Sequence, residues 1–205
     1  MNIVDHEWAA HPPQMRRITL AGLVRDFKWR RVCAWSKLHH NRDDIVDYCG
    51  EAEHVHQAIA RACRSKRPNG KHHNHQSKVP AAILSELERM LIGNSYRIRH
   101  AMSFEDLYDL IDKGKPKGIG PVTTYDVAVR IGAYLELTPR YVYLHAGAQE
   151  GYRELVKTGH ASDKWLTRII RLQDLPVELH VLSPDEVEDF LCVYRTVFAQ
   201  IGRSL

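Results

Sequence analysis

The chain has 205 residues, of which 44% are hydrophobic and 26% are charged, and 29 Lys and Arg against 25 Asp and Glu give it a formal charge of +4. This composition is that of an ordinary globular protein, so intrinsic disorder is excluded as the default state. The basic excess is small: it permits a nucleic-acid partner but does not require one.

Membrane insertion and export are not indicated by the hydropathy pattern. No apolar stretch is long enough to cross a bilayer, and residues 1–17 lack the apolar core of a signal peptide. The cysteines form no Cys-x-x-Cys pair and no regular disulfide framework; they are Cys33, Cys49, Cys63 and Cys192. We therefore expect a cytoplasmic protein with reduced thiols, no membrane contact and no bound cofactor.

The first half of the chain predicts short helices around one polar loop. Residues 1–13 are typical of a loose arm, and helical periodicity runs from about 18 to 40. Residues 45–63 predict one broken helix or two short helices, with the break at Gly50. The polar segment 64–80 carries both Pro and Gly and predicts a loop.

The second half carries clear helix-start signals. Pro80 opens a helix that a Gly-Asn pair ends, and Ser103 is the expected N-cap of another, with Asp106 as its capping-box partner. A further helix covers 123–137, and Ser183-Pro184-Asp185-Glu186 begins the last one. The only strand we predict is 141–145. The predicted fold class is therefore all-α. We divide the chain into an N-terminal helical region, 1–97, and a second region, 98–205.

Residues 103–135 read as helix, glycine-rich hairpin and helix. A tight turn whose amides face a phosphate requires open backbone angles and close approach, which glycine permits. The helix that follows the turn adds its N-terminal N–H groups, which favour an anion. Lys113, Lys115 and Lys117 flank the turn and add Coulomb attraction. The alternative interpretation is a plain structural turn between two helices.

This hairpin resembles the helix-hairpin-helix family of DNA-binding proteins, in which Gly-hydrophobic-Gly is followed by a small and then an aliphatic residue. Gly118, Ile119 and Gly120 match the hairpin, and Thr124 and Val127 match the later positions. The resemblance implies a sequence-independent grip on the DNA backbone. The resemblance also implies which residues contact the DNA, namely Lys115, Lys117, Gly118, Ile119, Gly120, Val122, Thr123 and Thr124.

The polar loop is the second candidate contact, because basic residues and histidines gather in it without an acidic residue. We expect it to follow phosphates with Arg67, Lys71, His72, His73 and His75. Zinc is the competing interpretation, but the spacing fits no compact knuckle, and we predict no metal site. The suitable ligand types are Cys49, His54, His56, Cys63, His73 and His75.

A weaker resemblance links the segment to the helix-hairpin-helix DNA glycosylases. Their second helix leads to a Val-Asp-Thr-His segment with the catalytic aspartate, and here Val142-Tyr143-Leu144-His145 follows. Tyr143 takes the place of that aspartate, and Val122 takes the place of the lysine nucleophile of bifunctional members. The resemblance implies the scaffold without its reaction centre, so we expect a DNA binder without catalysis.

Two alternatives remain open at this point. One is an enzyme, either a glycosylase with a displaced catalytic residue or a histidine-dependent nuclease, using residues such as His73, His75, Asp126 or His145. The other is a helical protein-interaction module with a protein partner, in which the hairpin is only a turn. Trp29 and Trp35, among basic residues, could stack on bases, although tryptophans in an amphipathic helix more often belong to a core.

Overall fold

A computed structural model describes residues 17–33, 44–66, 78–165 and 168–202. The all-α prediction is confirmed. The first seven helices are α1 (Leu20–Cys33), α2 (Asp44–Gly50), α3 (Val55–Arg64), α4 (Ala81–Gly93), α5 (Ser95–Arg99), α6 (Phe104–Gly114) and α7 (Pro121–Leu135). Strand β1 (Tyr141–Tyr143), helix α8 (Ala146–Lys157), strand β2 (Ile169–Arg171) and helix α9 (Pro184–Tyr194) follow. Short 3-10 helices lie at Asp163–Trp165, Leu172–Asp174, Val177–Val181 and Phe198–Gln200.

The predicted helix caps form at Ser103 and Ser183, although at Ser103 the Asp106 carboxylate accepts the hydroxyl and not the backbone N–H of a capping box. Ser103 Oγ accepts a hydrogen bond from the Asp106 N–H (3.1 Å) and donates one to the Asp106 carboxylate (2.7 Å). At α9 the Ser183 N–H donates to the Glu186 carboxylate (2.9 Å), which completes a capping box. Helix α2 ends at Gly50, so 45–63 forms two short helices.

The strand prediction was incomplete. Residues 141–143 form β1, as predicted. They pair antiparallel with β2, a strand that was not predicted, and Val142 lies opposite Ile170. Three residues are too few to show the alternation by which strands are recognised. The preference for a core tryptophan is also wrong at Trp29, which is 57% exposed on α1.

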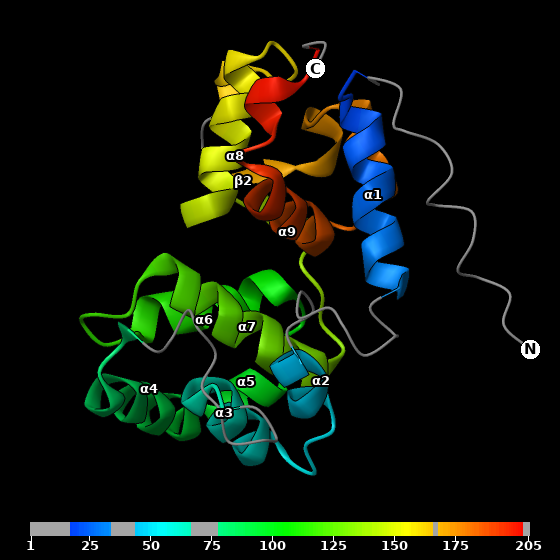
Figure 1. Cartoon of the computed structure of the whole chain (residues 1–205). Coiled ribbons are helices and arrows are strands. Elements are labelled where there is room, and N and C mark those ends of the chain that lie inside the picture. Colours follow the sequence, from blue (N-terminus) through cyan, green and yellow to red (C-terminus); the bar gives the residue numbers. More distant parts are fainter. Residues whose placement is uncertain (1–16, 34–43, 67–77, 166–167, 203–205) are drawn as a thin grey trace, which may run out of the picture.

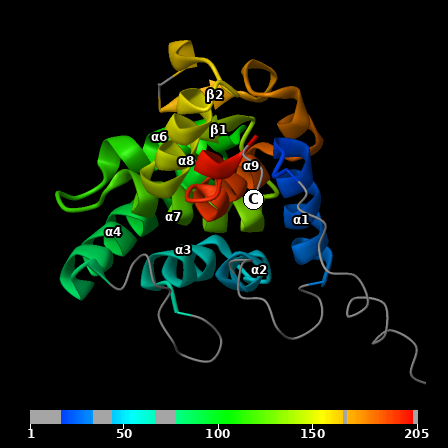
Figure 2. The same cartoon turned by 45° about the horizontal axis from the view of Figure 1, so that its top comes forward.

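Two hydrophobic clusters hold the chain together. One joins α1, β1, β2, α8 and α9 through residues such as Phe27, Tyr152 and Phe190. Figures 1 and 2 both place α1 beside α9. The other cluster is formed by the helices from α2 through α7. It contains residues from both sides of position 97. The division of the chain into 1–97 and 98–205 stays a prediction.

Strand β1 connects the two clusters. Successive side chains of a strand point to opposite faces. Val142 accordingly lies in the first cluster and Tyr143 in the second, and Leu144 returns to the first. Within the described segments, no helix combines the length and apolar character that crossing a bilayer requires.

Candidate nucleic-acid interface

Residues 115–120 form a tight turn between α6 and α7 that is anchored from within. The Ile119 N–H donates to the Pro116 carbonyl (3.2 Å), and the Ile119 side chain is buried in the second cluster. Gly118 has φ +103°, where side-chain-bearing residues are strained. A Cβ at Gly118 would also lie 2.8 Å from Ile83 Cδ1 of α4. The turn is therefore fixed by the buried side chain of Ile119 and by the absence of a side chain at Gly118.

The outer surface of this turn carries open hydrogen-bond donors. Gly118 and Gly120 are exposed, and the N–H groups of Gly118, Gly120 and Val122 meet no acceptor within the described part of the chain. Pro121 occupies the first helical position and has no N–H to offer. A Cβ built at Gly120 would meet nothing within 4 Å. The space over Gly120 is thus free for a ligand that accepts hydrogen bonds.

The three lysines around the turn differ in their engagement. Lys113 forms an ion pair with Asp109 (2.7 Å), and Lys115 is paired with Asp112 and lies 3.4 Å from Thr124 Oγ1. Lys117 is exposed, and the structure gives it no ion pair among the described residues. Lys115 therefore helps to hold the hairpin, and Lys117 is the cation available to an anionic partner.

Helix α6 is acidic, yet each of its carboxylates has a local partner. Asp109 and Asp112 pair with the two lysines, and Glu105 lies 3.3 Å from the Arg140 Nε. Asp106 accepts the Ser103 hydroxyl. These pairs reduce the negative potential that α6 would otherwise direct at a polyanion beside the hairpin.

The remaining predicted contacts divide into buried and undescribed residues. Thr123 and Thr124 are buried, and Thr124 Oγ1 donates to the Gly120 carbonyl (3.1 Å), so these side chains shape the turn. The Ile119 side chain is buried in the second cluster and anchors the turn. The loop residues Arg67, Lys71, His72, His73 and His75 lie outside the described residues. Helix α4, which follows that loop, contacts the hairpin at Gly118 through Ile83.

The segment that resembles the glycosylase reaction centre is buried. Tyr143 is 3% exposed, and its ring packs against Phe104, Tyr108 and Tyr125 with centroid distances of 5.6, 4.7 and 5.2 Å. Desolvation by burial, the largest cause, raises the pKa of the Tyr143 phenol above its usual value. This position is therefore a packing position within an aromatic cluster.

A second polar group, of which the sequence indicated only His145 and Asp126, lies where α7, α8 and α9 meet. His145 Nδ1 is 3.5 Å from the Glu188 carboxylate, and the His145 ring lies 4.7 Å from the Tyr125 ring. Burial raises the pKa of Glu188 well above its usual range, and the negative charges of Asp189, Asp126 and Asp185 raise it further. Only folding brings these residues together, because they belong to segments far apart in the chain.

This polar group is poorly suited to nucleic acid. The His145 and Glu188 side chains are 9% and 13% exposed, and the surrounding aspartates repel phosphate. The Tyr125 hydroxyl is buried and meets no hydrogen-bond partner among the described residues, and burial raises its pKa. His145, named above for a possible enzyme, thus lies in a shielded, negatively charged environment, and Asp126 contributes to that charge.

Metal-ligating residues are not clustered in the described part of the chain. No group of three His, Cys, Asp or Glu side chains there is placed to hold a metal ion. Cys49 and Cys63 are buried core residues, and burial raises the pKa of the Cys63 thiol. His73 and His75 lie outside the described residues.

Comparisons of the chain with protein-family models, with curated protein sequences and with solved structures found no match.

Proposed function

We propose that the protein binds DNA through the phosphate backbone, with the hairpin 115–120 and the first turn of α7 as the contact. The observation that carries this proposal is the set of backbone N–H groups at Gly118, Gly120 and Val122, which have no acceptor in the described part of the chain; Gly118 and Gly120 are exposed. Backbone amides at a helix N-terminus are good donors to phosphate oxygens, and they do not distinguish base sequence.

The charge around the turn supports the same proposal. Lys117 is exposed and has no described ion-pair partner, whereas the acids of α6 are engaged locally. The loop containing Arg67 and Lys71, which precedes α4, would extend the contact by following further phosphates. Binding without catalysis is the form we favour, because the His145 and Glu188 group is shielded and surrounded by negative charge.

Titration of the purified protein against two labelled duplexes of unrelated sequence, at several salt concentrations, tests this proposal. We expect similar affinities for the two sequences, and an affinity that falls steeply as salt rises. An abasic duplex is included as a third arm, and a marked preference for it would favour the glycosylase-like alternative. Absence of binding at low salt would overturn the proposal and leave the hairpin as a turn.

A further inference from the structure

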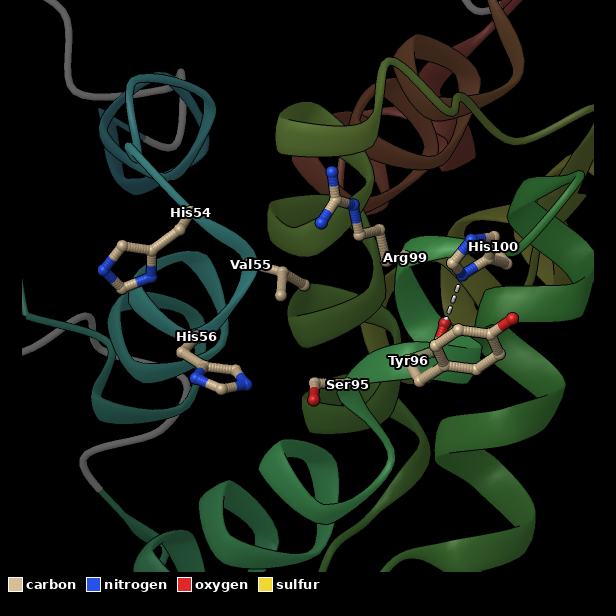
Figure 3. A pocket seen from close by; sticks show the side chains of 7 residues that line it. All are labelled: His54, Val55, His56, Ser95, Tyr96, Arg99 and His100. Carbon is tan, nitrogen blue, oxygen red and sulfur yellow. Dashed lines mark hydrogen bonds between the residues drawn. The ribbon is translucent and has the colours of Figure 1, made fainter.

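A hollow of about 490 Å³ opens between the start of α3 and the short helix α5, away from the hairpin residues. Val55 and His56 lie on the α3 side, and Ser95, Tyr96, Arg99 and His100 lie on the α5 side. In Figure 3 the Arg99 side chain lies between the histidines of the α3 side, at the left, and the Tyr96 and His100 pair, at the right. The volume falls within the range of small-molecule sites.

The ionisable groups of this hollow favour an anion. Arg99 is exposed and has no ion pair in the described part of the chain, and three histidines, His54, His56 and His100, also line the hollow. No aspartate or glutamate is among these described lining residues. A guanidinium offers two parallel N–H donors, which match the oxygens of a phosphate. The Ser95 hydroxyl adds a further donor.

The aromatic part of the hollow favours a planar group next to that anion. Tyr96 is 76% exposed, an unusual state for a large aromatic side chain. His100 packs on it at a centroid distance of 4.3 Å, and His100 Nδ1 hydrogen-bonds to the Tyr96 carbonyl (2.8 Å). That bond fixes the imidazole, so the pair forms a preorganised platform on which a nucleobase can stack.

We propose that this hollow binds a nucleotide, with its phosphate on Arg99 and the nearby imidazoles and its base on Tyr96. The same chemistry is offered by a free mononucleotide and by the phosphorylated end of a DNA strand. The proposal does not rest on the hairpin, because no residue of 115–120 lines the hollow.

Calorimetric titration with adenosine monophosphate, and with single-stranded oligonucleotides that carry or lack a 5′-phosphate, tests this proposal. We expect Arg99→Ala to weaken binding by about tenfold or more, since charge-assisted bonds to phosphate are lost. Tyr96→Ala should weaken binding of the nucleotide by about fivefold, through lost stacking, and leave binding of inorganic phosphate unchanged. Arg97→Ala is the matched control, because Arg97 is an exposed arginine of the same helix that does not line the hollow.

The outcomes separate the sources of the ligand and the two proposals. Equal affinity for the mononucleotide and the 5′-phosphorylated strand identifies a free nucleotide as sufficient, and tighter binding of the strand identifies a DNA end. No binding of either probe, or equal losses in Arg97→Ala and Arg99→Ala, would overturn the proposal. Gly120→Val should leave nucleotide binding unchanged, whatever it does to duplex binding.

Discussion

The hairpin and the contact between α8 and α9 use glycine and charge in opposite ways. At the hairpin, a Cβ on Gly120 would meet nothing within 4 Å, and Lys117 is exposed. Between α8 and α9, a Cβ on Gly151 would lie 2.0 Å from the Leu191 carbonyl oxygen, and the Glu188 side chain is only 13% exposed. One region leaves polar backbone and charge exposed, and the other closes over both. Glycine therefore leaves the backbone uncovered in one place and permits close helix packing in the other.

The largest effect we expect is on the closed side. Gly151→Ala places a methyl group against the Leu191 carbonyl oxygen. Because that atom belongs to the backbone of α9, it can move away from the methyl group only if α8 and α9 separate. We expect a loss of about 3 kcal/mol in the free energy of unfolding, at the upper end of overpacking effects. Chemical denaturation measures it. A loss below about 0.5 kcal/mol, the range of ordinary surface substitutions, would mean that the helices are not in close contact at this point.

Gly118 tests whether the hairpin is anchored from within. Gly118→Ala combines the strain of φ +103° with a close contact to Ile83, so we expect a loss of about 1.5 kcal/mol. Gly120→Ala is the control, with a change within about 0.5 kcal/mol. Thermal and chemical denaturation of both variants give the comparison. Equal losses would show that the two glycines are held in the same way.

Glu188 tests the closed side through pH. Burial and the surrounding aspartates raise its pKa, so the folded state holds this proton more tightly than the unfolded state does. The corresponding stability is present below the unfolded pKa of about 4.3 and is lost as pH rises through the folded pKa. Ionising Glu188 in the folded state costs about 1.4 kcal/mol of stability for each pH unit by which its folded pKa exceeds its unfolded pKa.

Glu188→Gln removes this charge. We expect the variant to unfold at higher denaturant than the wild type near pH 8, and the two to converge near pH 4. His145, Asp126, Asp185 and Asp189 stay in place in the variant, so the difference reports on the Glu188 carboxyl. A variant less stable than the wild type near pH 8 would mean that His145 stabilises the charged carboxylate.

The smallest effect concerns the open side. Lys117→Ala removes one exposed cation, so we expect duplex affinity to fall by about threefold and the salt slope to decrease by about 1. Lys113→Ala is the matched control, because Lys113 is already paired with Asp109. Anisotropy titrations at several salt concentrations measure both. A larger loss in the Lys113 variant would contradict the assignment of Lys117 as the available cation.

The sequence was informative where structure is local. Ser103 and Ser183 cap their helices, and the hairpin forms between the two predicted helices, because the residues that determine these features lie within a few positions of one another. Gly118 and Gly120 look alike in the sequence. They differ in the folded chain, because Gly118 takes φ +103° and Ile83 of α4 lies beside it.

The features that were missed depend on long-range packing. Strand β2 is three residues long and is defined by its pairing with β1. The His145 and Glu188 pair joins the start of α8 to α9, and the hollow joins α3 to α5. Trp29 lies in α1, whose other face packs in the first cluster, so its exposure follows from the position of that neighbouring cluster. No spacing rule within one segment predicts such contacts.

The most direct test of the DNA-binding proposal is duplex affinity in Gly120→Val, with Gly93→Val as the matched control. In both, the new Cβ meets nothing within 4 Å and φ is compatible with a side chain, so both variants should stay folded. We expect Gly120→Val to lose about tenfold or more in affinity, since phosphate can no longer approach the amides closely enough to accept their hydrogen bonds. Gly93→Val should bind within about twofold of the wild type, as a surface change away from the contact does. A folded Gly120→Val protein that binds DNA as tightly as the wild type would contradict the hairpin as the site of contact.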